Sequence, residues 1–235
     1  MVGAVLFDLD DTLVDHQHAN RAAVAGVRER FRALQRVGLD DLVAENARLL
    51  DQLHRGVALG HLTVDAARLE RYRWLFAYAG ADNDPNAADA ARAHRVLYRK
   101  HRRRVPGALE LLQALSPRVR IGVVTNNTHA EQREKLATFG LAPHVEVLVT
   151  SEQVGVAKPD SRIFAAALAR LDCAPGDAVM IGDSLVNDVQ GALAAGISAV
   201  WFDRFGGRLP PKVAVPVLTS LEPTADVARR ILERE

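Results

Sequence analysis

Acidic residues are concentrated near the start of the sequence. Asp8, Asp10 and Asp11, with Thr12 beside them, follow the apolar run 2–6. Three carboxylates in so short a segment repel one another unless a cation neutralises them, whereas a turn needs only one Asp or Asn. Mg²⁺ prefers carboxylate, carbonyl and water ligands and is often shared with a substrate phosphate. This segment therefore predicts a magnesium site that binds phosphate.

Polar side chains also follow three later segments. Thr125 and Asn126 come after an apolar run and offer a hydroxyl and backbone N–H groups at a predicted helix start, where phosphate binds favourably. Lys158 lies in a loop before another helix, and Asp183 and Asp188 follow a further apolar run. Each of these has a commonplace explanation alone, since Thr, Asn and Asp are ordinary residues at helix starts. Their combination with the first acidic segment predicts one shared site.

Short apolar runs supply the strands of a predicted sheet, and segments with helical periodicity separate them. The expected strands are 2–6, 119–124, 145–149, 178–181 and 197–201, and the expected core helices are 107–115, 130–139, 161–171 and 187–195. This alternation indicates an α/β fold, a doubly wound parallel sheet of Rossmann-like type. Ligands of such sheets bind at the carboxyl ends of the strands, where the polar residues are expected.

Residues 15–101 interrupt the alternation, because they contain no comparable strand and are rich in Ala, Leu, Arg and Glu at helical spacing. Their expected helices are 20–36, 39–54, 64–79 and 87–101. The sequence therefore predicts an all-helical cap, or lid, domain at 15–101 inserted into a catalytic core of 1–14 and 102–235. A Pro-rich tail at 208–222 and a short helix at 224–233 are expected to finish the core.

The polar segments resemble the four motifs of the haloacid dehalogenase superfamily of hydrolases. Its Asp-x-Asp-x-Thr motif is matched by Asp8, Asp10 and Thr12, its Ser or Thr by Thr125, its lysine by Lys158, and its Gly-Asp-x-x-x-Asn-Asp by Gly182, Asp183, Asn187 and Asp188. The insert resembles that family's helical cap of the first class. Within it, the segments 60–63 and 71–75 look similar to the branch of nucleotidases and acylneuraminate phosphatases.

The resemblance implies a Mg²⁺-dependent phosphomonoester hydrolase of phosphatase type. In it Asp8 would attack phosphorus and become an aspartyl-phosphate, while Asp10 would act first as a general acid and then as a general base. Asp8 and Asp183 would bind Mg²⁺ through their side chains and Asp10 through its backbone carbonyl. Thr125, Asn126 and Lys158 would bind the phosphate, and Asp188 and Thr12 would orient these groups from behind.

Three alternatives follow from the same residues. Dehalogenation is disfavoured, because displacement of a halide needs no acid and the dehalogenases lack a carboxylate at the position of Asp10. A sugar phosphomutase of the same fold stays open, although Thr12 stands where those mutases tend to carry an apolar residue. A catalytically silent phosphate-sensing or scaffold protein is opposed by the intact set of motif residues.

Composition narrows the partners and the location. The formal charge is +1, which gives no general attraction to nucleic acid or to an anionic membrane. The basic run 99–104 is interpreted as a solvated helix end, and no apolar run approaches the length of a membrane span. With a single cysteine and no signal-peptide pattern, we expect a cytoplasmic enzyme that acts on a small phosphorylated metabolite.

Overall fold

A computed structural model describes residues 2–58, 61–206 and 214–233. The chain forms two compact units, one of Met1–Asp15 with Arg104–Glu235 and one of His16–Arg103. Residue 60 of the cap pattern and most of the first half of the expected tail lie outside the described residues. Among the helices of the described ranges, none is both long and apolar enough to cross a membrane.

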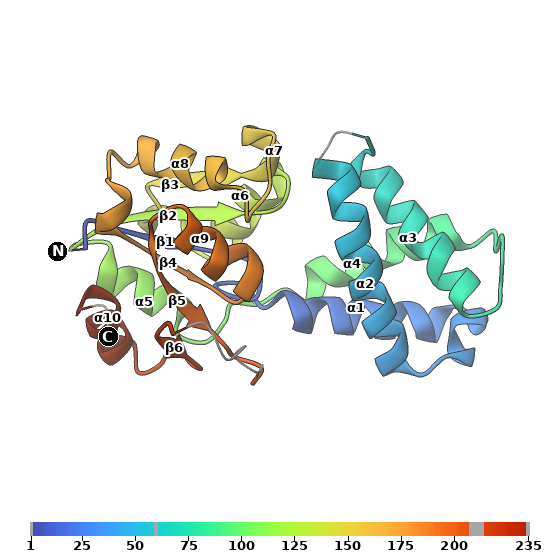
Figure 1. The fold of residues 1–235 in the computed structure, drawn as a ribbon. Helices are drawn as coiled ribbons and strands as arrows, with labels where there is room; N and C mark the ends of the chain where they lie inside the picture. The colour runs from blue at the N-terminus through green and yellow to red at the C-terminus, as the bar shows by residue number, and fades with distance from the viewer. Residues whose placement is uncertain (1, 59–60, 207–213, 234–235) are drawn as a thin grey trace. The chain divides into compact units, whose positions relative to one another are not determined.

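Parallel strands form the sheet of the first unit in the order β3-β2-β1-β4-β5-β6 (Figure 1). The strands are β1 (Ala4–Phe7), β2 (Arg120–Thr125), β3 (Val147–Thr150), β4 (Ala178–Gly182), β5 (Ser198–Phe202) and β6 (Val217–Leu218). The central β1 pairs with β2 on one side and β4 on the other, with Phe7 opposite Val123 and Ile181. The predicted α/β fold is confirmed, and β6 is an addition to it, formed by two residues of the expected tail.

Helices cover both faces of this sheet. They are α5 (Ala108–Leu115), α6 (His129–Thr138), α7 (Ser151–Val154), α8 (Ser161–Arg170), α9 (Gly191–Ala194) and α10 (Thr224–Glu233), with 3₁₀ turns η2 (Ala142–His144) and η3 (Pro175–Asp177). Val5 and Phe7 of β1 pack in a core cluster with α5 and α10, whereas Ala4 and Leu6 pack in a second cluster with α8. Burial on both faces explains why the strands are continuous apolar runs in the sequence.

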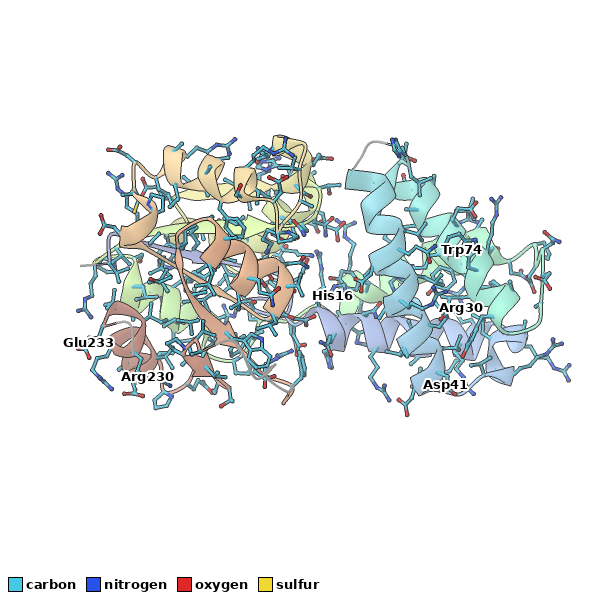
Figure 2. The ribbon with its side chains drawn as sticks, in the orientation of Figure 1. His16, Arg30, Asp41, Trp74, Arg230 and Glu233 are labelled. Atoms are coloured by element: carbon cyan, nitrogen blue, oxygen red, sulfur yellow. The ribbon has the colours of Figure 1, made fainter. Side chains whose placement is uncertain are left out.

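The regular secondary structure of the second unit is all helical within its described residues. It contains α1 (His16–Arg30), the 3₁₀ helix η1 (Arg32–Arg36), α2 (Leu39–Ala58), α3 (Val64–Tyr78) and α4 (Ala87–His101). Figure 2 labels His16 and Arg30 at the two ends of α1. Phe76 of α3 is buried in the core of this unit, and the ring of Phe31 meets it edge-on with 5.9 Å between centroids.

Buried polar side chains join the four α-helices described in this unit. Asn20 Oδ1 accepts hydrogen bonds from Asn46 Nδ2 (2.9 Å) and His94 Nε2 (3.2 Å), and Arg71 Nη2 donates to His94 Nδ1 (3.2 Å). Because a guanidinium can only donate, Nδ1 must accept and Nε2 must carry the proton, which makes the imidazole neutral. Burial lowers the pKa of His94 well below its ordinary value, and the charge of Arg71 lowers it further.

The prediction of one helix over 20–36 is wrong at both ends. The helix α1 begins earlier, because Ala19 is also buried and extends the apolar face towards the N-terminus. It ends at Arg30 because Phe31 adopts an extended conformation (φ −120°, ψ 106°), and η1 follows as a separate turn. Arg28 stabilises that turn, since its Nε donates to Val37 O at 2.8 Å.

Candidate active site

A tight turn after β1 carries Asp8 and Asp10. The backbone N–H groups of Leu13 and Val14 both donate to Leu9 O, at 3.0 and 2.9 Å, and close the turn. Leu9, Leu13 and Val14 are completely buried, so the turn is anchored in the core of the sheet unit. The two carboxylates are thereby fixed at the carboxyl end of the central strand, where the sheet topology places a ligand site.

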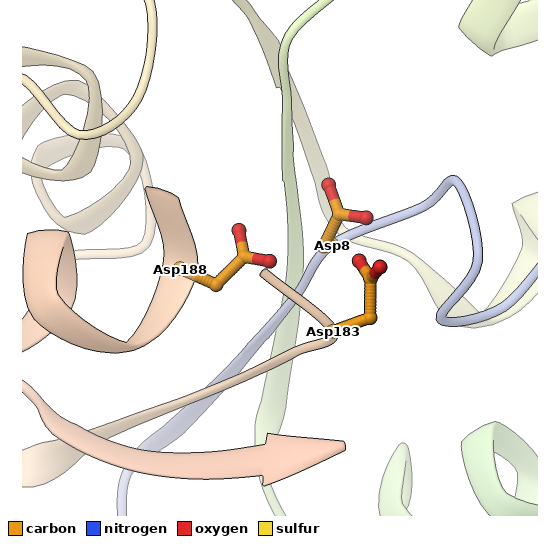
Figure 3. A group of neighbouring side chains, drawn as sticks. All are labelled: Asp8, Asp183 and Asp188. Carbon is orange, nitrogen blue, oxygen red and sulfur yellow. The ribbon is translucent and has the colours of Figure 1, made fainter. Parts of the chain in front are cut away.

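The carboxylates of Asp8, Asp183 and Asp188 point toward one another (Figure 3). One ligand oxygen from each side chain lies within 4.8 Å of the others. Asp183 directly follows β4, and Asp188 lies one turn further along the chain. Gly182 makes room for this approach, because a Cβ there would lie 2.3 Å from the Asp188 carboxyl carbon.

The segment after β4 begins as a π-helix rather than as the α-helix predicted over 187–195. This element, η4 (Leu185–Gln190), continues into α9. Ser184 caps it, since its Oγ accepts from Asn187 N (3.2 Å), while Ser184 N donates to Asp188 Oδ2 (2.9 Å). The wider π turn changes the direction of the side chains that follow a strand end, and such segments are frequent at functional sites.

Lys158 is the cation of this carboxylate group. Its buried Nζ donates to Asp8 Oδ1 at 2.5 Å and to Asp188 Oδ1 at 2.6 Å. Burial alone would lower the pKa of Lys158, but Asp188 and Asp8 together raise it well above its ordinary value, so the ammonium stays charged. One carboxylate oxygen of Asp188 thus accepts a hydrogen bond from Lys158 and the other accepts one from the backbone N–H of Ser184, and together they fix the orientation of the side chain.

Burial raises the pKa values of two of these carboxyl groups. The pKa of Asp8 is raised from 3.8 to about 7, mainly by burial, with Lys158 opposing the rise. Burial also raises the pKa of Asp183 to about 9, with added repulsion from Asp8 and Asp188. If the carboxyl groups of Asp8, Asp183 and Asp188 were all ionised, the one ammonium of Lys158 would leave two negative charges unbalanced, and the raised pKa values show the cost of that excess charge.

A divalent cation fits this arrangement. All the converging side chains are carboxylates, the hard oxygen donors that suit Mg²⁺ or Mn²⁺, and two charges would balance the excess. Bound between Asp8 and Asp183, such a cation would offset both the cost of burying their charges and the repulsion that adds to it in raising both pKa values. The buried acidic cluster could therefore hold a metal ion.

Asn126 positions Lys158 through the backbone. Asn126 Oδ1 accepts from Lys158 N at 2.7 Å, and Asn126 Nδ2 donates to Lys158 O at 3.0 Å. Its side chain is therefore engaged with the lysine backbone. The sequence pattern pointed to Asn126 as a phosphate ligand, and it contained no sign of this two-point contact.

Asp10 lies apart from the carboxylate group, and α6 provides its partners. Lys135 Nζ donates to Asp10 Oδ1 at 2.6 Å and Oδ2 at 2.8 Å, and Gln132 Nε2 donates to Asp10 Oδ2 at 3.0 Å. Gln132 Nε2 also donates to Thr125 Oγ1 at 2.7 Å. Gln132 and Lys135 were not predicted as site residues from the sequence. Their one available signal was a shared helix face, because they are three positions apart in a predicted helix.

The remaining predicted site residue is Thr12. It is completely buried within the turn after β1, and its Oγ1 has no hydrogen-bond partner within the described ranges. The structure therefore brings Asp8, Lys158, Asp183 and Asp188 into one group, and Asp10 and Thr125 into a second that Gln132 joins.

Comparison with known proteins finds relatives that are similar in sequence and in fold. The family model of the haloacid dehalogenase-like hydrolases matches residues 2–196. Over 208 residues the chain is 36% identical to the ribulose-1,5-bisphosphate 5-phosphatase of Halopiger xanaduensis, which covers 86% of this chain and 85% of that protein. It is 31% identical over 226 residues to the phosphoserine phosphatase of Thermus thermophilus, and this match covers 85% of this chain and 88% of that protein.

A solved structure agrees with these relatives. The magnesium-bound HAD-hydrolase YfnB of Bacillus subtilis matches with a TM-score of 0.76 at 26% identity and covers 97% of this chain and 98% of that one. The chain therefore belongs to the haloacid dehalogenase-like hydrolases. Within that family it is an enzyme of phosphatase type, a phosphoric monoester hydrolase.

Proposed function

We propose that the chain hydrolyses a small phosphate monoester through an aspartyl-phosphate formed on Asp8, with Mg²⁺ as its cofactor. The observation that carries the proposal is the placement of Asp8. Its carboxylate is buried at the end of the central strand, 2.5 Å from Lys158 Nζ and grouped with Asp183 and Asp188. A buried carboxylate with cationic neighbours can approach an anionic phosphate, whereas in water the two anions would repel each other.

The reaction proceeds in two steps with Asp10 moving one proton each time. In the first, an Asp8 carboxylate oxygen attacks phosphorus, the ester P–O bond breaks, and the leaving oxygen takes a proton from Asp10. In the second, water attacks phosphorus, the bond to Asp8 breaks, and a proton of that water passes to Asp10 as inorganic phosphate forms. The side chain of Asp10 is partly exposed, so a leaving group and water can reach it.

Other residues of the chain hold the phosphoryl group. Thr125 accepts a hydrogen bond from Gln132, so its own hydroxyl proton is directed elsewhere and can bind a phosphoryl oxygen. Lys158 neutralises charge between Asp8 and phosphate, and Asp188 and Asn126 hold it in place. Mg²⁺, held by the side chains of Asp8 and Asp183 and the backbone carbonyl of Asp10, would supply the charge that lowers the repulsion between nucleophile and phosphate.

A small metabolite is the proposed substrate. The named relatives act on ribulose-1,5-bisphosphate and on phosphoserine, which differ in structure but are both small phosphate esters. On this proposal the division of the chain into a core of 1–14 and 102–235 and a helical cap of 15–101 also has a function. The core supplies the chemistry, and the cap selects the ester.

The proposal is tested by Asp8→Asn. We expect Mg²⁺-dependent hydrolysis of phenyl phosphate by the wild type, and its loss in the variant and with a chelator. Acid-quenched wild-type protein should gain the mass of one phosphoryl group during turnover, at a peptide containing Asp8, and the variant should not. Asp226→Asn makes the same chemical change on the exposed face of α10 and should keep full activity. Full activity in Asp8→Asn would overturn the covalent mechanism.

A further inference from the structure

Two completely buried polar side chains project from one face of α6. Gln132 and Lys135 are both at 0% exposure. The neighbouring Leu136 packs in an apolar core cluster, so α6 also contributes to the core of the sheet unit. Burying a lysine costs free energy through desolvation unless a charged partner compensates it. A role for this lysine must therefore be sought in the group that it contacts.

That group is the side chain of Asp10. Lys135 Nζ contacts both carboxylate oxygens, at 2.6 and 2.8 Å, whereas the Glu131 carboxylate is 3.9 Å away. Contacts to both oxygens restrain the orientation of the Asp10 carboxyl group as well as its distance from Lys135 Nζ. An acid that must meet one leaving oxygen gains from such restraint, because a displacement of about 1 Å can reduce a rate about 10²-fold.

Gln132 extends the restraint to the proposed phosphate site. One amide nitrogen donates to Asp10 Oδ2 at 3.0 Å and to Thr125 Oγ1 at 2.7 Å, so it spans the ends of β1 and β2. The position of Asp10 is thereby set relative to the residue that binds the phosphoryl oxygens.

We propose that Lys135 and Gln132 are positioning residues that hold Asp10 where it can protonate the leaving group. This inference rests on the proposed function, because it assigns a role within that reaction. In that reaction neither Lys135 nor Gln132 touches the phosphoryl group. Their loss should therefore impair the ester bonds that need an acid and spare those that do not.

The test compares leaving groups in Lys135→Met, which removes the ammonium and keeps an unbranched side chain that is one atom shorter. Steady-state kcat/KM is measured for a series of substituted phenyl phosphates, since this parameter reports transfer to Asp8 and excludes the later hydrolysis. Dinitrophenolate leaves readily without a proton, whereas unsubstituted phenolate benefits from one. We expect kcat/KM to fall about 10²-fold for phenyl phosphate and less than about 3-fold for dinitrophenyl phosphate.

Three further variants make the result decisive. Asp10→Asn should show the same dependence on the leaving group. Gln132→Met should show it in weaker form, and it decides the outcome if Lys135→Met does not fold, as judged by circular dichroism. Glu131→Gln is the matched control on the same helix, because it leaves the contacts to Asp10 intact, and its profile should match the wild type.

Equal losses on all esters, or none, in the folded Lys135 and Gln132 variants would overturn the inference. So would a weaker affinity of Lys135→Met for inorganic phosphate as an inhibitor, since that would place the lysine in the phosphate site. A different result would show that the proposed function itself is wrong. In that case the wild type would hydrolyse none of the phenyl phosphates, or Asp8→Asn would hydrolyse them at the wild-type rate.

Discussion

Replacement of Gly182 by alanine tests how closely the site is packed. Gly182 ends β4, and a Cβ at this position would lie 2.3 Å from both Cγ and Oδ2 of Asp188 and 2.6 Å from its Cβ. Unbonded carbon atoms are most stable at about 3.5–4.0 Å, so Asp188 must retreat by roughly 1 Å or more. It cannot do so freely, because its two oxygens are bound to Lys158 Nζ at 2.6 Å and Ser184 N at 2.9 Å.

The cost follows from these contacts. Overpacking of a buried position costs about 1–3 kcal/mol, and the loss of a hydrogen bond to a charged group costs about 1.5–3 kcal/mol. We therefore expect Gly182→Ala to lower the free energy of unfolding by about 3–5 kcal/mol. Displacement of Asp188 also releases Lys158 from its position beside Asp8, so kcat/KM for phenyl phosphate should fall about 10²-fold.

Urea unfolding and steady-state kinetics measure the two effects. Gly176→Ala is the matched control, because a Cβ at Gly176 would meet nothing within 4 Å, and its stability should stay within about 0.5 kcal/mol of the wild type. If Gly182→Ala keeps wild-type stability and kcat/KM, the packing argument is refuted. Equal losses in both variants would show that the effect of alanine does not come from its contact with Asp188.

Two further predictions concern pH. Without metal, the folded state retains protons on Asp8 and Asp183 that the unfolded state releases, so the free energy of unfolding should fall as pH rises from 3.8 through about 7 and on to about 9. Mg²⁺ should reverse this fall, and Asp183→Asn should weaken both effects in thermal melts; a Mg²⁺ response unchanged in that variant would contradict the assignment. In the helical unit, the unfolded state binds a proton below pH 6.5 that buried His94 does not, so stability should also fall as pH drops through that value. His94→Gln should flatten this acid limb in melts followed by circular dichroism, and an unchanged limb would assign it to other groups.

The sheet was predictable because its strands are buried on both faces. The run 178–181, for example, contains no polar residue, and Gly182 and Asp183 mark its end. The boundary of α1 was not predictable from periodicity. Phe31 and Leu34 continue the apolar pattern beyond Arg30, but they pack from a separate 3₁₀ turn rather than from the same helix. A periodic pattern shows which side chains are buried and does not show where the backbone changes direction.

The residue types of the site were predictable for a similar reason, whereas their supports were not. Carboxylates after buried strands are conspicuous, and parallel strands bring their carboxyl ends to one edge. Lys135 is inconspicuous, because Glu131 lies four residues before it and the pair has the spacing of an ordinary exposed ion pair. Only the fold shows that this lysine is buried and contacts Asp10, which is 125 positions away in the chain.

The two aspartates of the first motif have different electrostatic surroundings, and this difference accounts for their different proposed roles. Asp8 shares Lys158 with Asp188 and also faces Asp183, so its group has an excess of negative charge that attracts a divalent cation. The single ammonium group of Lys135 contacts both carboxylate oxygens of Asp10, whose side chain lies outside the carboxylate group. A metal ion would therefore bind on the side of Asp8, where in the proposed mechanism its charge would assist nucleophilic attack. In that mechanism the side chain of Asp10 would be left to exchange protons with the leaving group and water.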